Sequence, residues 1–195
     1  MQSKTTAVGV VATVLIGAAT FAVLGQSGTE DMIAVADYGA NGQLAFPAGT
    51  DRWIAVGSGL GGNYAVEPFD PAQPGPISVV QMEPSAYDYF LKTGRYADGT
   101  MFLLTFYATQ KQPNPALQGF VQADVVGREI HVIDKQRFAQ EGSGFFVFSN
   151  GTGTPAAPMP VGSACVECHS EHGAFDGTFV QFYPSLRGRQ RAAGK

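Results

Sequence analysis

Cys165-Val-Glu-Cys168-His169 is the stretch around which the rest of this chain is expected to fold. The pattern Cys-x-x-Cys-His is typical of the covalent attachment of a c-type haem. Residues three apart share one face of a helix, so Cys165 and Cys168 can each form a thioether to one vinyl group of the same porphyrin. His169 follows directly and can offer an imidazole nitrogen to the iron. We therefore predict one covalently bound haem c with His169 as axial ligand.

Two other interpretations are open for a pair of cysteines with this spacing. A redox-active pair is typical of a thioredoxin-like βαβ context, and half of a zinc site needs a second pair of ligands. The sequence shows neither context, and it holds 2 cysteines in all. The haem interpretation is therefore preferred.

The composition suits a small domain around a large apolar group. A chain of 195 residues is long enough for one domain with a real core and a short leader. Charged residues make up only 14% and aromatic residues 11%, and the net charge is −4. No basic patch of the kind that binds nucleic acid is visible, since the short run from Arg187 to Arg191 is typical of a solvated end.

The N-terminal residues 1–25 are predicted to be a signal peptide or a membrane anchor. Lys4 supplies a positive charge, residues 7–25 carry none, and no clear Ala-x-Ala cleavage site follows. The domain is expected in the periplasm, soluble after cleavage or tethered to the inner membrane through residues 7–25. Residues 26–38 are interpreted as a linker and residues 39–195 as the haem domain.

The rest of the chain predicts an α+β fold with an antiparallel sheet and a few short helices, following the N-terminal hydrophobic helix. The expected strands are 77–82, 100–108, 118–126, 128–134 and 144–149, and the expected helices are 84–94 and 163–172. Strands 118–126 and 128–134 are expected to pair with a connection near Gly127. Alternation along 100–108 places Phe102 and Leu104 on one face, and Met101 and Leu103 on the other.

A glycine-rich stretch, Gly57-Ser-Gly59-Leu-Gly61-Gly62, matches the Gly-x-Gly-x-x-Gly pattern of dinucleotide-binding proteins. That site needs a helix to begin directly after the glycines, and the chain continues instead with two prolines and no apolar period. We interpret the stretch as a loop.

Several further pieces of sequence resemble the cytochrome P-460 family, which includes the cytochromes c′-beta. The resemblance extends from about Phe46 to Arg187 and is strongest at the Cys-x-x-Cys-His end. Its anchors are Asp51-Arg-Trp53, Lys92-Thr-Gly94 with Asp98-Gly-Thr100, Lys135-Gln-Arg-Phe138, Phe145-Phe-Val-Phe148, and Phe179-Val-Gln-Phe-Tyr-Pro-Ser-Leu-Arg187. The resemblance implies an antiparallel sheet, a homodimer and one haem c with an open distal side.

One position departs from the lysine-linked members of that family. Their strand after Asp-Gly-Thr carries a lysine that is crosslinked to the porphyrin, and the corresponding residue here is Leu104. Leucine has no nucleophilic atom, so the chain resembles the cytochromes c′-beta, which lack the crosslink and bind nitric oxide and carbon monoxide. We predict an apolar distal pocket that includes Phe102 and Leu104, with ordinary core packing as the alternative.

Other polar residues offer alternatives for the distal side. His131 and Glu129 alternate on one face of their strand and are candidates for an acid or base, or for a sixth ligand in the case of His131. A surface histidine is the alternative interpretation of His131. His172 is expected at the surface or in a proximal hydrogen bond. Met82 and Met101 are further candidates for a sixth ligand, although methionines more commonly belong to a core. The candidates to pair with the haem propionates are Arg128, Arg137 and Arg187.

Three functions remain open from the sequence. The first is binding of nitric oxide or a similar small ligand by an exported cytochrome. The second is an enzyme that oxidises hydroxylamine or nitric oxide without the lysine crosslink, with Glu129 or His131 as proton acceptor. The third is electron transfer to a redox partner protein, which needs two strong axial ligands.

Overall fold

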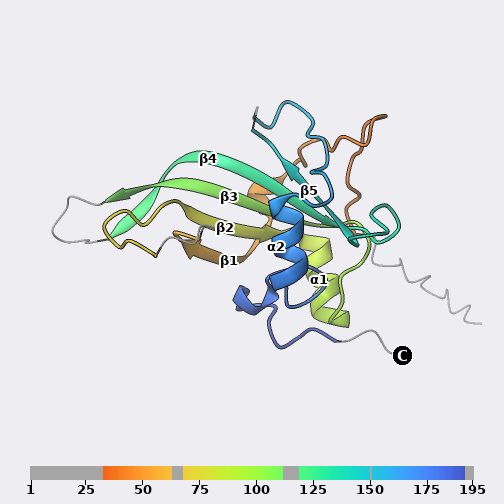
Figure 1. Ribbon diagram of the computed structural model, residues 1–195. Helices are drawn as coiled ribbons and strands as arrows, with labels where there is room; N and C mark the ends of the chain where they lie inside the picture. Colours follow the sequence, from red (N-terminus) through yellow and green to blue (C-terminus); the bar gives the residue numbers. More distant parts are fainter. Residues whose placement is uncertain (1–32, 63–67, 112–118, 150, 192–195) are drawn as a thin grey trace, which may run out of the picture.

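The computed structural model describes residues 33–62, 68–111, 119–149 and 151–191. Its centre is an antiparallel sheet with the strand order β1-β2-β3-β4-β5 (Figure 1). The strands are β1 Ile54–Leu60, β2 Ile77–Met82, β3 Thr100–Lys111, β4 Phe120–Ile133 and β5 Ser143–Val147. The α-helices are α1 Pro84–Thr93 and α2 Ala164–His172, and the 3-10 helices are η1 Thr50–Arg52 and η2 Val180–Phe182. The predicted α+β class with an antiparallel sheet is confirmed.

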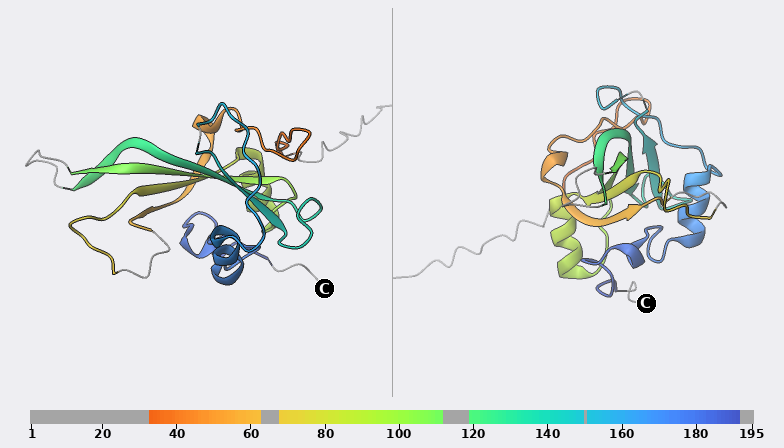
Figure 2. Two further views of the ribbon diagram at one scale, coloured as in Figure 1. Left: turned by 45° about the horizontal axis from the view of Figure 1, so that its top comes forward. Right: turned by 90° about the vertical axis from the view of Figure 1, so that its left-hand side faces the viewer.

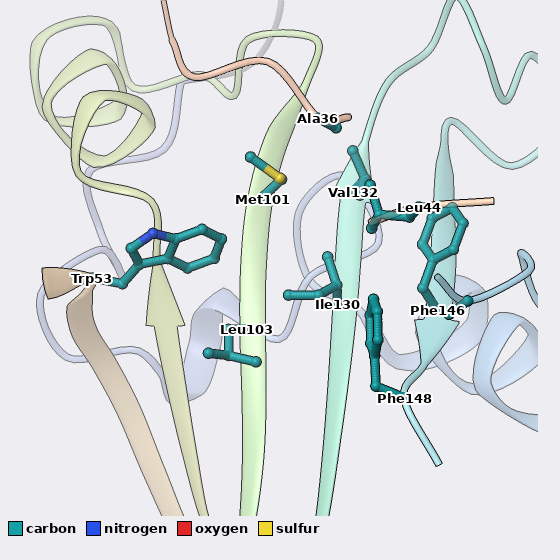
Figure 3. Packing of buried hydrophobic residues seen from close by; sticks show 10 residues of the cluster. Ala36, Leu44, Trp53, Met101, Leu103, Ile130, Val132, Phe146 and Phe148 are labelled. Carbon is teal, nitrogen blue, oxygen red and sulfur yellow. The ribbon is translucent and has the colours of Figure 1, made fainter. Parts of the chain in front are cut away.

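The two faces of the sheet carry two separate cores, as the alternation on β3 predicts. Met101 and Leu103 pack with Ile130 and Val132 of β4 on one face (Figure 3). Phe102 packs on the other face with residues of α1 and of the C-terminal segment. Figure 2 shows both α-helices on one side of the sheet, with the C-terminal segment running between them. The second face is thus the one that the helices and the C-terminus cover.

Helix α1 begins and ends where the sequence predicts. The Glu83 carboxylate accepts a hydrogen bond from the Ala86 N–H at 2.8 Å, and Pro84 occupies the first helical position. Gly94 ends the helix in the left-handed conformation, with φ of 72°, and its N–H donates to the Phe90 carbonyl. The side chain of Phe90 is fully buried and anchors the helix on the sheet.

Three glycines lie in strands where the sequence predicted a connection or a loop. No turn separates two strands at Gly127, because β4 runs through it and pairs Gly127 with Phe106 of β3. A side-chain carbon there would lie 3.4 Å from the Phe106 ring, in van der Waals contact with it. Gly57 and Gly59 belong to β1 rather than to a loop, and a side-chain carbon on Gly57 would meet the Tyr183 ring at 2.8 Å.

The packed domain begins before residue 39. Ala36 is buried in the first core, and Tyr38 forms an isolated bridge with Leu44, so the end of the expected linker 26–38 lies against the sheet. The predicted leader, residues 1–25, and linker residues 26–32 lie outside the described residues. Among the helices that the structure describes, none has the length and apolar character to cross a membrane.

Candidate functional site

A cavity of about 560 Å³ lies on the helix-covered face of the sheet. Its size falls within the range of cofactor and ligand pockets, roughly 300–1,000 Å³. Phe102, Leu104, Glu129, His131 and His169 all line it, so the structure brings together these predicted site residues from β3, β4 and α2. Further lining residues are glycines of β1, Phe145 of β5, and Phe179, Phe182 and Tyr183 of the C-terminal segment.

The imidazole of His169 is held in one orientation. Its Nδ1 lies 2.7 Å from the Gly177 carbonyl oxygen, which can only accept, so Nδ1 carries the proton and Nε2 remains available to a metal. The rings of Phe145 and Phe179 each lie 4.6 Å from the imidazole, centroid to centroid. Burial lowers the pKa of His169, and the Gly177 hydrogen bond raises it by a smaller amount. The lowered pKa favours the neutral imidazole, which is the form that binds iron.

The carbonyl that orients His169 comes from a loop that the sequence analysis missed. A side-chain carbon on Gly173 would lie 2.9 Å from the Cα of Gly177, so only glycine lets the loop return this closely to the end of α2. Thr178 fixes the loop to the rest of the domain, since its buried hydroxyl lies 3.1 Å from the Tyr96 hydroxyl. The two glycines after the Cys-x-x-Cys-His motif are the signal that could have revealed this loop.

Cys165 and Cys168 lie one turn apart on α2, and both thiols are partly exposed and free. Helix α2 packs beside β5. Burial raises the pKa of Cys165, and the nearby Glu129 carboxylate raises it further, which places this cysteine close to a residue that lines the cavity. The helix therefore presents one end of its motif near Glu129 and its histidine near Phe145.

His131 is buried, with 8% of its surface exposed, which excludes the interpretation as a surface histidine. Its ring stacks on Phe145 at 4.2 Å and meets His169 edge-on at 5.0 Å, and its Nε2 has no hydrogen-bond partner among the described residues. Rings at this separation are in direct contact. A porphyrin cannot lie between them, so the prediction of His131 as sixth ligand would require one ring to move.

The remaining wall of the cavity is largely apolar. Phe102 is buried and Leu104 half-buried on the cavity face of β3. Glu129 is the cross-strand partner of Leu104, and burial raises the pKa of its carboxyl group. No lysine of the described chain lines the cavity, and position 104 presents a hydrocarbon side chain to it.

Of the other candidate residues from the sequence, Arg187 lines the cavity, and Met82, Met101, Arg128, Arg137 and His172 do not. Met82 and Met101 are core residues, the latter on the opposite face of the sheet. The guanidinium groups of Arg128 and Arg137 lie over the rings of Phe46 and Tyr38, away from the cavity. Arg187 is the member of the three arginines that lines the cavity. His172 is exposed at the end of α2.

These features together fit a haem. The cavity is large enough for a cofactor and mostly apolar, a neutral imidazole faces it, and two thiols with the attachment spacing lie on the adjoining helix. Fold and site thus define a haem-binding cytochrome.

The sequence matches the family described as Cytochrome P460 over residues 61–180, a range that holds the cavity residues from Phe102 to Phe179. The chain belongs to the cytochrome P460 family, as its sequence resemblance implies. A comparison with curated proteins gave no match.

The burial of His131 predicts a dependence of stability on pH. Burial, with a smaller effect of His169, lowers the pKa of His131 well below its ordinary value, whereas in the unfolded chain the ring takes up a proton below about pH 6.5. Stability should therefore be lost as the pH falls below that value, with a slope approaching 1.4 kcal/mol per pH unit for this group. The H131F variant has no such proton, so its free energy of unfolding should depend less on pH.

Denaturant unfolding of both proteins at about pH 7 and about pH 5 measures this difference. Phenylalanine keeps the ring stacked on Phe145, so the comparison changes the proton and leaves the packing close to native. Equal slopes in the two proteins would contradict the prediction, because they would mean that the folded protein protonates His131 as readily as the unfolded chain does.

Proposed function

We propose that this chain is an exported mono-haem c cytochrome that binds nitric oxide or a similarly small neutral ligand. The observation that carries the proposal is the hydrogen bond from His169 to the Gly177 carbonyl, which leaves Nε2 of a neutral imidazole for the iron of a group in the cavity. The bound haem would supply an iron with a position for an exogenous ligand.

Three residues of α2 would hold the haem. Each thiol, of Cys165 and of Cys168, would add its S–H bond across one vinyl group, so that sulfur bonds one carbon and the hydrogen moves to the other. His169 would bind the iron through Nε2. Arg187 is the basic side chain of the lining that could pair with a haem propionate, since guanidinium suits carboxylates.

The apolar walls favour a neutral ligand over an anion. Phe102 and Leu104 offer no hydrogen bond and no charge, and burial of an unpaired anion beside them would be costly. Leu104 also has no atom that could form the porphyrin crosslink of the lysine-linked cytochromes. The side chains of Phe102 and Leu104 therefore support the proposal of ligand binding at a haem without a crosslink.

Export and assembly form part of the same proposal. Residues 7–25 would carry the domain into the periplasm and either be removed or remain as an anchor, since their uncharged stretch is close to the length of a membrane span. A periplasmic location agrees with covalent haem c, which is attached outside the cytoplasmic membrane. A homodimer is proposed on the resemblance to the family alone.

Absorption and EPR spectra of the purified protein test the proposal, in the ferric and ferrous states and before and after nitric oxide. We expect a high-spin, five-coordinate iron and a stable nitrosyl, without the red-shifted ferrous band of a lysine-linked haem. A low-spin, six-coordinate spectrum that nitric oxide leaves unchanged would overturn it.

The L104Q variant should bind the anion azide more tightly than the wild type, whereas V126Q, on an exposed part of β4, should not.

A second function is favoured by the raised pKa of Glu129. A half-buried carboxyl group that holds its proton more tightly than usual, and that lines the same cavity, is suited to proton transfer during oxidation of hydroxylamine. If the chain is such an enzyme, E129Q should lower its turnover by about 100-fold or more while the haem spectrum is retained. Wild-type protein that fails to oxidise hydroxylamine in the presence of an electron acceptor would exclude this function.

A further inference from the structure

The carbonyl that orients His169 belongs to a tight turn between Phe175 and Thr178. The two central residues, Asp176 and Gly177, have positive φ angles of 45° and 67°, which is typical of the two-residue turn that an Asp-Gly pair forms. Two backbone hydrogen bonds close the turn, from the Thr178 N–H to the Phe175 carbonyl at 2.9 Å and from the Phe175 N–H to the Thr178 carbonyl at 3.4 Å. A hairpin this small is marginally stable by itself, so its conformation depends on contacts with the rest of the domain.

The direction of the Gly177 carbonyl is set by the position of Thr178. This carbonyl and the Thr178 N–H belong to one trans peptide group and point in opposite directions. The N–H donates to the Phe175 carbonyl, while the carbonyl accepts from His169 Nδ1 at 2.7 Å. A contact that fixes Thr178 therefore also fixes the hydrogen bond to the imidazole.

The Tyr96 hydroxyl holds Thr178 from within the core. The Thr178 hydroxyl donates its proton to the Phe175 carbonyl at 2.7 Å, so it accepts from the Tyr96 hydroxyl at 3.1 Å. Thr178 is fully buried and Tyr96 is 8% exposed, so this bond is shielded from water. The Tyr96 ring stacks on Phe90 at 4.6 Å and meets Phe102 edge-on at 5.4 Å, which fixes the position of its hydroxyl.

Lys135 holds the same turn from the surface. Its Nζ lies 3.0 Å from Asp176 Oδ1, and its backbone N–H donates to the Asp98 carboxylate at 2.9 Å. Asp98 precedes β3, and the next residue, Gly99, donates its N–H to the Ile133 carbonyl at 2.7 Å. The ion pair thus connects the turn beside His169 to the ends of β3 and β4. Because 57% of the Lys135 side chain is exposed, this pair should contribute less than the buried hydroxyl pair.

We propose that Tyr96 and Lys135 are positioning residues for the iron ligand: they hold the turn from two sides and so keep the Gly177 carbonyl against His169 Nδ1. The inference rests on the proposed haem site. A carbonyl held against the Nδ1–H makes the imidazole a stronger donor to the iron, which favours the ferric state. Neither Tyr96 nor Lys135 lines the cavity, so each acts on the haem through the turn.

The first test compares Y96F with Y87F, because Tyr87 packs partly buried against the same core. Y96F removes one hydroxyl and leaves the ring packed on Phe90. NMR detects the Nδ1–H proton of His169 in the diamagnetic ferrous protein that bound carbon monoxide provides. In Y96F its signal should move toward that of an imidazole N–H without a partner, and its exchange with solvent should be about fivefold faster, as expected for loss of one buried hydrogen bond. Y87F should match the wild type.

The reduction potential is a second readout, which a loss of stability alone would not shift. The potential of Y96F should lie above that of the wild type, because a weaker imidazole donor stabilises the ferric state less. Y87F should retain the wild-type potential. Neither substitution changes a charge, so the shift reports on the imidazole. If either the potential or the Nδ1–H signal of Y96F stays at its wild-type value, the role of Tyr96 is overturned.

The second test concerns the ion pair between Lys135 and Asp176. K135Q and D176N each remove one charge, and asparagine tolerates the left-handed conformation of the turn. Each variant should move the Nδ1–H signal as Y96F does and speed its exchange about twofold, because the pair is exposed. K135Q/D176N should show no larger change than either single variant, since both remove the same interaction.

K135R should retain the wild-type signal, because it keeps the charge that pairs with Asp176. K111Q is the matched control, since Lys111 is exposed at the end of β3, and it should also match the wild type. Effects of K135Q and D176N that add in the double variant, or a wild-type signal in K135Q, would overturn the role of Lys135.

The outcomes separate this inference from the proposed function. If the purified protein carries no haem, the proposed function is wrong, and the Nδ1–H signal of the haem-free chain still tests whether Tyr96 and Lys135 hold the turn. If the protein carries a haem that binds carbon monoxide, while Y96F and K135Q leave the His169 signal unchanged, the proposed function stands and the inference is wrong.

Discussion

Replacing both Cys165 and Cys168 with alanine should abolish covalent haem in this protein. The thiols lie one turn apart on α2, and the chain has 2 cysteines in all, so no other residue can form a thioether. Haem staining after denaturing electrophoresis should fall to background, and the intact mass should lack the mass of one haem. The expected loss is complete because a covalent bond is either formed or absent.

The matched control is E167A, which changes an exposed residue of α2 between the two cysteines. This variant should stain like the wild type, since alanine favours the helix and Glu167 faces water. Either single variant, C165A or C168A, should retain one thioether and a shifted pyridine haemochrome spectrum. A double variant that still carries haem through denaturation would contradict the prediction and direct attention to a nucleophile other than sulfur.

Loss of the haem should also weaken the fold. The cavity of about 560 Å³ is lined mainly by aromatic and aliphatic side chains, which gain contacts only when a large apolar group fills the space. The double variant should therefore unfold at lower temperature than E167A. The difference in unfolding temperature reports on the packing of the haem in the cavity, whatever small ligand the iron binds.

Local sequence patterns predicted the structure correctly where local interactions determine it. The bounds of α1 follow from Pro84 at its first position and Gly94 in the left-handed conformation, both of which are visible in the sequence. The alternation on β3 correctly assigns Phe102 to one face and Met101 to the other. The spacing of Cys165, Cys168 and His169 likewise predicts a helix, which the structure forms from Ala164 to His172.

The errors arise where a residue far along the chain determines the structure. Gly127 has the appearance of a turn, but it lies within β4 and pairs with Phe106 on the neighbouring strand. Gly57 lies in β1, paired with Val80 of β2, and a side-chain carbon there would meet the Tyr183 ring, a contact that no local pattern contains. Alternation gives the face on which His131 lies, but not that Phe145 and His169 cover it.

Replacing His169 with glycine should remove the axial imidazole and restore it when free imidazole is added. The Gly177 carbonyl and the rings of Phe145 and Phe179 would border the space left by the side chain, so a small planar ring could occupy it. Absorption and EPR spectra should lose the histidine-ligated signature in H169G and regain it with imidazole. Covalent haem staining should persist if both thiols remain available.

The matched control is H172G, one turn further along α2, where the side chain is exposed. Both substitutions place glycine in α2, and H169G in addition loses the hydrogen bond to Gly177 and the ring contacts of the imidazole, so the return of the signal with free imidazole is what identifies the lost ligand. His131 is the residue that could replace His169 as ligand in this variant. Its Nε2 is buried and lacks a hydrogen-bond partner among the described residues, and its ring contacts His169. If H169G alone keeps an imidazole-bound iron, the signal should disappear in H169G/H131F. Persistence in that double variant would contradict the assignment of His169, since the cavity would then contain neither of its two histidines.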